Sequence, residues 1–282
     1  MRLFSRLNRA ESSGLKPDVP AAKGVAEFFK NSGPISGKKS VGAGGWIGAM
    51  VLVSRWFPLP LSPPMVRRFR EGNLVGRIIE TEACVAEGAA WLAASEPRFA
   101  DALRQTGPLP LRRNAGGFAT LLDAIVSQQV SVASADAIWR RLDLAGLTDA
   151  AAVLRASDED LRACGLSRQK MAYAKALAEA GIDYGALRHA PSDQVIATLV
   201  SVKGVGVWTA EIYAMFALGR ADVFAAGDLA LQEAARVLFD LPERPSDKVL
   251  RRMAEPWAPW RAVAARLLWA YYHVAKAREG IR

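Results

Sequence analysis

From Thr81 onward, apolar side chains recur every three or four residues, which is the repeat of an α-helix that buries one face. The clearest run consists of Phe118, Leu121, Leu122, Ile125 and Val126. No run of useful length alternates apolar and polar residues, as a half-buried strand would. The pattern therefore predicts an all-α domain over residues 79–282.

Glycine and proline mark the ends of the shorter predicted helices. These helices cover residues 158–163 before Gly165, 168–180 before Gly181 and 192–202 after Pro191. Farther towards the N terminus, Gln128 and Gln129 interrupt an otherwise apolar face. Two amides in such a place are solvated, cap a helix or carry a function.

A turn with two glycines separates two helical patterns within residues 192–218, and this arrangement predicts a helix-hairpin-helix. The turn consists of Lys203, Gly204, Val205 and Gly206. Its glycines allow backbone conformations closed to other residues, so successive N–H groups can face outward at the start of the second helix. Such a helix start suits a phosphate, although a plain connection between two helices with glycine caps shows the same pattern.

Asp228 directly precedes a further helical pattern that includes Leu231. An aspartate at this place is an ordinary N-cap, whose side chain accepts hydrogen bonds from the first amides of the helix. The N terminus of a helix also favours a charged carboxylate. A structural and a chemical role are therefore compatible at Asp228.

Residues 1–78 contain clusters of glycine and proline and no sustained period, which predicts a largely disordered extension that proteases would remove before residue 80. Residues 1–80 hold 13 Lys and Arg against 5 Asp and Glu, and the remainder holds 24 against 23. Most of the net charge of +9 therefore lies in the extension, so charge alone does not predict DNA binding by the helical domain. The apolar run at 41–54 is too short and too rich in glycine for a membrane helix.

Two segments closely resemble the signature of a known family. Residues 199–210, with the hairpin, and 222–229, with Asp228, resemble the helix-hairpin-helix, Gly/Pro/Asp superfamily of DNA glycosylases. Within it the chain looks most like the 3-methyladenine DNA glycosylase II branch, and the likeness spans residues 98–272. The resemblance implies two helical subdomains with the active site in the cleft between them.

The resemblance also implies roles for single residues. Asp228 matches the catalytic aspartate, Gln129 matches the side chain that fills the gap left by a flipped base, and Gln128 belongs to the same DNA-facing turn. Electron-rich rings attract a cationic base, so Trp208 and Trp269 are candidate walls of the base pocket. For Trp269, simple burial in the core is the alternative.

The chain departs from the family pattern in and near the expected pocket. Ile212 and Ala270 stand where the inducible bacterial enzyme has aromatic residues, which predicts a less aromatic pocket and leaves the substrate range open. Ala225 replaces the usual proline, a change that would loosen the loop before the catalytic aspartate. His189 and His273 have no acid or cysteine at ligand spacing and are interpreted as non-catalytic.

Two missing features define the expected reaction type. Bifunctional members of the superfamily have a lysine nucleophile where this chain has Trp208. The endonuclease III branch holds an iron–sulfur cluster with four cysteines, whereas this chain has only Cys84 and Cys164. We therefore expect a monofunctional glycosylase without a catalytic metal or other cofactor; a monovalent cation at the hairpin–phosphate contact is left open.

The main hypothesis is a monofunctional DNA glycosylase that hydrolyses the N-glycosidic bond of alkylated purines, chiefly 3-methyladenine and 7-methylguanine, and leaves an abasic site. One alternative is an enzyme of the same superfamily acting on deaminated or mismatched bases, and another is a non-catalytic hairpin protein that only binds DNA. We expect a monomer that acts on damaged double-stranded DNA and does not engage membranes. In a bacterium it would be cytoplasmic and nucleoid-associated; in a eukaryote, nuclear or mitochondrial.

Overall fold

The computed structural model describes residues 75–278, so most of the predicted extension and its expected proteolysis lie outside the described residues. Within them the chain forms helices and loops, with no strand beyond an isolated antiparallel bridge between Ile78 and Arg220. The predicted all-α class is confirmed. No helix between residues 75 and 278 is both long and apolar enough to cross a membrane.

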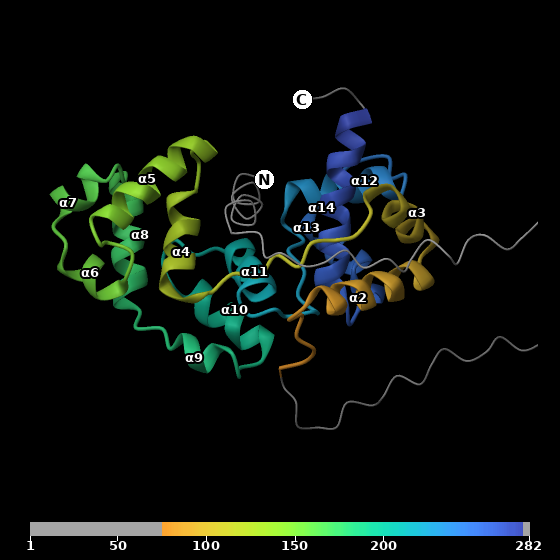
Figure 1. The fold of residues 1–282 in the computed structure, drawn as a ribbon, viewed down its shortest axis with the longest axis horizontal. Coiled ribbons are helices and arrows are strands. Elements are labelled where there is room, and N and C mark those ends of the chain that lie inside the picture. Colours follow the sequence, from red (N-terminus) through yellow and green to blue (C-terminus); the bar gives the residue numbers. More distant parts are fainter. Residues whose placement is uncertain (1–74, 279–282) are drawn as a thin grey trace, which may run out of the picture. The chain divides into compact units, whose positions relative to one another are not determined.

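In chain order (Figure 1), the elements are α2 (Glu82–Ser95), α3 (Pro97–Thr106), α4 (Gly117–Val126), α5 (Val132–Leu144), α6 (Ala150–Arg155), α7 (Asp158–Ala163), α8 (Arg168–Glu179), α9 (Tyr184–Leu187), α10 (Ser192–Val200), α11 (Val207–Phe216), α12 (Leu229–Leu238), α13 (Asp247–Met253), the 3₁₀ turn η2 (Glu255–Trp257) and α14 (Arg261–Arg278). The three short helices predicted from glycine and proline are α7, α8 and α10.

Short polar side chains begin several of these helices. Ser131, Ser157 and Ser167 are the N-caps of α5, α7 and α8, and each accepts a hydrogen bond from an N–H in the first turn. Gly165 and Gly181 follow α7 and α8 with φ of 96° and 56°. This left-handed conformation ends a helix without strain at glycine, which explains why glycine located the helix ends so well.

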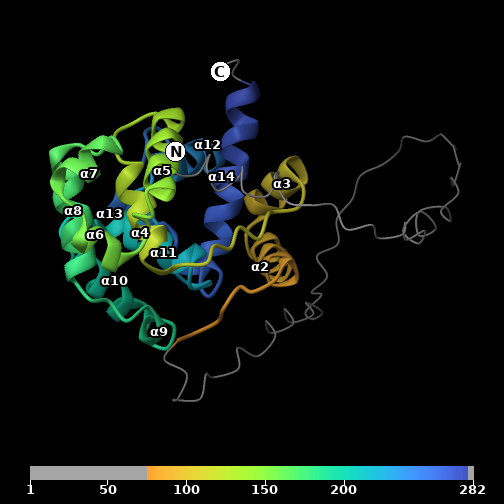
Figure 2. The same ribbon diagram turned by 60° about the vertical axis from the view of Figure 1, so that its left-hand side comes forward.

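The helices form two groups on either side of α11 in Figure 1, and in the turned view of Figure 2 the first group comes forward and overlaps α12 and α13. In the first, α4 packs on α5 and α8, and α8 packs on α6 and α7. In the second, α14 packs on α2, α3 and α12, and α13 packs on α12. Because α11 contacts α4, and its Phe216 ring lies 5.8 Å from that of Trp269 in α14, this helix joins the two groups.

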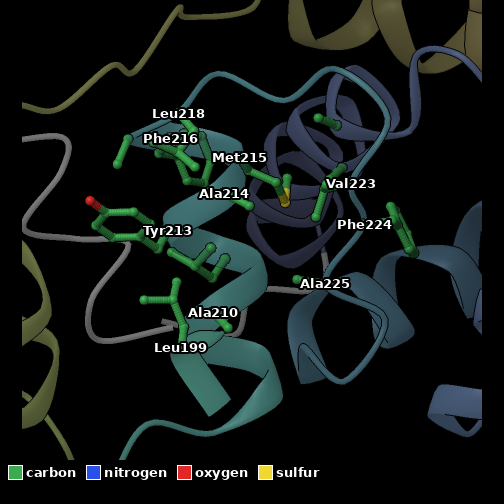
Figure 3. Close-up of a cluster of buried hydrophobic side chains, with 14 of the residues drawn as sticks. Leu199, Ala210, Tyr213, Ala214, Met215, Phe216, Leu218, Val223, Phe224 and Ala225 are labelled. Atoms are coloured by element: carbon green, nitrogen blue, oxygen red, sulfur yellow. The ribbon is translucent and has the colours of Figure 1, made fainter. Parts of the chain in front are cut away.

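α11 is buried along nearly its whole length, from Thr209 to Phe216. Figure 3 shows its side chains in one apolar cluster with Val223, Phe224 and Ala225 of the loop that follows. Such packing fixes both the start of α11 and the loop leading to α12. The candidate site is therefore built on rigid elements.

The described chain begins with a segment that packs on the loop after α11. Arg220 is 1% exposed and donates a hydrogen bond to the carbonyl of Val75 at 2.9 Å. The amide nitrogen of Ile79 donates to the carbonyl of Gly219 at 2.7 Å. These contacts begin at residue 75, slightly before residue 79, where the sequence places the start of the helical domain.

Candidate active site

Asp228 is the N-cap of α12 and only 5% of its surface is exposed. Its Oδ1 accepts hydrogen bonds from the backbone nitrogens of Ala230 at 2.9 Å and Leu231 at 3.1 Å. The same oxygen accepts a bond from Nε1 of Trp269 at 3.1 Å, and Oδ2 accepts one from Nε1 of Trp208 at 3.0 Å. The predicted capping role is therefore present, together with two indole donors that a cap alone does not need.

All four of these donors to the Asp228 carboxylate are neutral N–H groups, and they come from α11, α12 and α14. Together with the positive end of the α12 dipole, they stabilise a negative charge on the carboxylate. Each carboxylate oxygen has about two acceptor positions, and Oδ1 accepts three of the four bonds. Oδ2 is therefore the oxygen with capacity left for a water molecule or a developing positive charge.

Trp208 and Trp269 are both brought to Asp228, although they differ in burial. Trp269 is 2% exposed and packs against Phe216, so its predicted core role and its place at the site coexist. Trp208 is half-buried at the start of α11. Ile212 follows it by one helical turn and is 7% exposed, which places both on one face of α11.

The two glycines of the hairpin differ in conformation. Gly204 has φ of 96°, and a Cβ there would lie 2.3 Å from Cγ of Tyr173. Gly206 has φ of −87°, an extended conformation that any residue adopts, and nothing lies within 4 Å of an added Cβ. The prediction that both glycines are needed for an unusual backbone conformation is therefore wrong for Gly206.

The hairpin amides also differ in what they can offer to a phosphate. The nitrogen of Val205 donates to the carbonyl of Val202 at 3.0 Å, so this predicted phosphate donor is already engaged. Gly206 is the N-cap of α11, and no side chain caps that helix. The first amides of α11 therefore keep their donors for an outside acceptor, next to the exposed Lys203.

Gln128 and Gln129 lie in the turn between α4 and α5, but in different surroundings. Gln129 is exposed and has φ of 55°, in the left-handed region that is unusual for residues other than glycine. Gln128 is half-buried, and its Nε2 donates to the carbonyl of Gly204 at 3.0 Å. The turn thus exposes Gln129 and is fastened to the hairpin by Gln128, and the wedge assignment of the two residues stays a prediction.

Comparison with known proteins places this geometry in a family. Residues 122–259 match the family model described as HhH-GPD superfamily base excision DNA repair protein. DNA-3-methyladenine glycosylase 1 of Schizosaccharomyces pombe is 33% identical over 172 residues, which are 57% of this chain and 75% of that protein. The chain belongs to the HhH-GPD superfamily.

Solved structures of other HhH-GPD proteins share the fold of this chain. The DNA-3-methyladenine glycosidase of Bacillus halodurans aligns with a TM-score of 0.61 and 32% identity, covering 70% of this chain and 92% of that one. The Schizosaccharomyces pombe 3-methyladenine DNA glycosylase in complex with abasic DNA aligns with a TM-score of 0.57 and 27% identity, covering 65% and 95%. The resemblance to the 3-methyladenine branch seen in the sequence is confirmed.

The loop before Asp228 in this HhH-GPD protein is firmly held, although Ala225 stands in place of the expected proline. Ala225 is fully buried, and its carbonyl accepts a hydrogen bond from the nitrogen of Asp228 at 3.0 Å. The carbonyl of Phe224 accepts from the nitrogen of Ala226 at 3.0 Å, and the carbonyl of Ala226 accepts from Gln232 Nε2 at 2.9 Å. These hydrogen bonds hold the loop without a proline, and the loosening expected from Ala225 stays a prediction.

Sequence reasoning missed an ion pair that joins α11 to α13. Oε1 of Glu211, a residue only 3% exposed, lies 2.8 Å from Nη1 of Arg251, which also pairs with Asp247 at 3.2 Å. Burial raises the pKa of Glu211, and the hydrogen bond and charge of Arg251 oppose that shift. The one sequence signal was an acidic residue inside the apolar run of α11, a place where a charge needs a partner.

The remaining candidates for metal or acid–base chemistry lie away from this arrangement. Between residues 75 and 278, no three His, Cys, Asp or Glu side chains gather as metal ligands would. Cys84 and Cys164 are both free thiols. His189 and His273 are exposed, and neither is among the donors to Asp228.

Proposed function

We propose that this HhH-GPD protein is a monofunctional glycosylase that hydrolyses the N-glycosidic bond of alkylated purines in double-stranded DNA and leaves an abasic site. The observation that carries the proposal is the buried Asp228 carboxylate, held by four N–H donors just after a helix-hairpin-helix. The names of the relatives, which are 3-methyladenine glycosylases from a yeast and a bacterium, support this substrate class.

The chemistry follows from where charge develops in the reaction. As the bond between sugar and base breaks, the sugar gains oxocarbenium-like positive charge, which a fixed carboxylate in a dry site stabilises more in the transition state than in the ground state. Asp228 Oδ2, with one hydrogen bond, is the oxygen that would face the sugar or orient the attacking water. A purine methylated at a ring nitrogen is already cationic and leaves without a strong general acid.

The surroundings of Asp228 support hydrolysis without strand cleavage. Lyase activity requires an amine that attacks the sugar, and Trp208 stands at the matching position with its indole N–H donated to Asp228. Trp208 also offers a half-buried aromatic surface on which a cationic base can stack, beside the aliphatic Ile212. We therefore place the base between these groups and the Asp228 carboxylate, with Gln129 entering the emptied position in the duplex.

DNA methylated at purine nitrogens provides the test, with chromatography of the bases released. We expect 3-methyladenine and 7-methylguanine to be released, and Asp228→Asn to lower the single-turnover rate by about 100- to 1000-fold. Asp149→Asn is the matched control, because Asp149 caps α6 in the same way but has no indole donors. Equal release by the wild type and Asp228→Asn would contradict the assignment of Asp228.

Two further measurements distinguish the alternatives. Borohydride should trap no covalent complex with abasic DNA, and a trapped complex would overturn the monofunctional assignment. In a panel of duplexes with single lesions, release of deaminated or mismatched bases alone would replace the substrate class proposed here. DNA binding without release of any base would identify a non-catalytic hairpin protein.

A further inference from the structure

The turn that carries the wedge residue Gln129 begins where α4 ends at Val126. The last carbonyls of a helix have no partner inside it, and the helix dipole makes this end negative. Gln129 holds a left-handed backbone conformation with φ of 55°, which costs energy for a residue with a side chain. Something outside the turn must therefore hold it in shape.

Lys170 supplies one such support from α8. Its Nζ donates a hydrogen bond to the carbonyl of Val126 at 2.7 Å, and the residue is only 8% exposed. Lysine is seldom buried to this degree, because its charge loses solvation. Burial accordingly lowers the pKa of Lys170. Lys170 therefore loses solvation in order to bind the negative end of α4. This loss indicates that the contact has a role in holding that end.

Gln128 supplies the second support, directed towards the hairpin. Its Nε2 donates to the carbonyl of Gly204 at 3.0 Å, and this glycine packs so closely on Tyr173 that a Cβ would lie 2.3 Å from the ring. Tyr173 belongs to α8, the same helix as Lys170. The turn is therefore tied at two points to one unit made of α8 and the hairpin.

The space beside the turn is hollow. A pocket of about 250 Å³, partly open to solvent, has Gln128, Gln129, Val130, Gln169, Lys170 and Tyr173 in its lining. Close packing is what normally resists displacement of a loop, and a cavity removes part of that resistance. The two polar ties of the turn therefore do more to hold Gln129 in place than they would if packed side chains filled this pocket.

We infer that Lys170 and Gln128 are positioning residues for base flipping: they brace the turn so that Gln129 can enter the base stack and stay there. The inference rests on the proposed function, and on Gln129 as its wedge. A side chain that enters a duplex is opposed by base stacking and pairing. A turn beside an unfilled pocket, without further support, would be displaced by this opposing force. A braced turn transmits the protein's binding energy to the DNA.

The two readings of Lys170 predict different kinetics. If Lys170 only stabilises the fold, its loss lowers activity on every substrate to the same extent. If it braces the wedge, its loss matters most where flipping is costly and least where the lesion has no partner base. The ratio of rates on a paired and an unpaired lesion is therefore the deciding measurement.

Lys170→Met in the full chain tests this, with 7-methylguanine placed either opposite cytosine or opposite an abasic analogue. Single-turnover base release from the paired lesion should fall about 10- to 100-fold, and from the unpaired lesion less than about threefold. Lys170→Arg, which keeps a cationic donor, should recover most of the paired rate. Lys175→Met is the control: Lys175 lies on the same helix and pairs with Asp158 near the surface, so both rates should stay unchanged.

Equal losses on both duplexes, or no loss on either, would overturn the inference. Should Lys170→Met fail to fold, Gln128→Leu decides, because it breaks the other tie and must lower the paired rate selectively; an equal loss or none would again overturn it. A wild-type protein that releases no base from either duplex would overturn the proposed function, and the inference with it.

Discussion

Asp228, the proposed catalytic residue, and Gln129, the proposed wedge, are held in opposite ways. Asp228 is 5% exposed, and its carboxylate accepts hydrogen bonds from N–H groups of three helices. Gln129 is exposed and has a left-handed backbone conformation. The hydrogen bonds that hold its turn are made by its neighbour Gln128 and by Lys170. One group is surrounded by its supports, and the other projects beyond them.

The difference follows from what each group has to meet. A carboxylate that stabilises a charge on the sugar works best when it is fixed and dry before the substrate arrives, because then no reorganisation is needed during the reaction. A wedge must project into DNA, so other side chains cannot enclose it. Its rigidity must come from contacts made by the turn that carries it. Substitutions that affect one region, the other or both should separate these requirements.

Gly204→Ala should have the largest effect, because Gly204 serves both regions. Its φ of 96° disfavours a side chain, and a Cβ would collide with Tyr173 at 2.3 Å. We expect a loss of about 2–4 kcal/mol in the free energy of unfolding, from the strained backbone and the overpacking together. Because its carbonyl binds Gln128 and its hairpin leads into α11, DNA binding and base release should fall with stability. Urea unfolding and binding titrations measure this.

Gly206→Ala is the matched control within the same hairpin. Gly206 has an ordinary backbone conformation and nothing within 4 Å of an added Cβ, so the free energy of unfolding should stay within about 0.5 kcal/mol of the wild type. DNA binding by Gly206→Ala can still be weaker than that of the wild type, because Gly206 is exposed at the start of α11. Equal destabilisation by both substitutions would show that the left-handed conformation of Gly204 is not the cause.

Trp208→Phe should affect only the buried end of the site. The change keeps an aromatic ring and removes the hydrogen bond from Nε1 to Asp228 Oδ2. A hydrogen bond to a charged group contributes about 1.5–3 kcal/mol, so the single-turnover rate should fall about 10- to 100-fold. The ratio of paired to unpaired rates should stay at its wild-type value. Trp91→Phe, at an exposed tryptophan of α2, should change neither quantity.

The contrast between the two regions also shows how far the sequence could be interpreted. The apolar period located α4 correctly, glycine located the C-terminal ends of α7 and α8, and Asp228 was found at the N-cap that its neighbours predict. These features depend on residues a few positions apart. The catalytic role proposed for Asp228 came from the family resemblance, since an N-cap by itself has no chemical signature.

What the sequence did not indicate are the polar contacts between distant segments. The bonds from Gln128 to Gly204 and from Lys170 to Val126 join residues 76 and 44 positions apart. Periodicity says which face of a helix is buried, but not which polar atom meets which across two helices. For the same reason Glu211 was recognisable only as a misplaced charge, without its partner Arg251.

Glu211→Gln should have the smallest effect, and pH should change its size. Glu211 lies one turn after Trp208 on α11, and its partner Arg251 is 44% exposed and keeps Asp247 as a second partner. Arg251 is therefore not left buried and uncompensated, so the loss of stability should be about 1 kcal/mol or less. The free energy of unfolding in urea, measured from pH 4 to pH 7.5 for both proteins, gives the difference.

Burial raises the folded-state pKa of Glu211 above its ordinary value of 4.5, so the unfolded chain loses this proton first as the pH rises. The stability that Glu211 contributes is then full below pH 4.5 and declines as the pH passes through the raised pKa, so the wild type's advantage over Glu211→Gln should shrink towards neutral pH. Glu233 provides the opposite case, because the hydrogen bond from Arg236 lowers the pKa of Glu233. Glu233→Gln should therefore lower the free energy of unfolding at neutral pH and leave it unchanged in acid. Identical pH trends for the two variants would show that the charge of Arg251, and not burial, governs the pKa of Glu211.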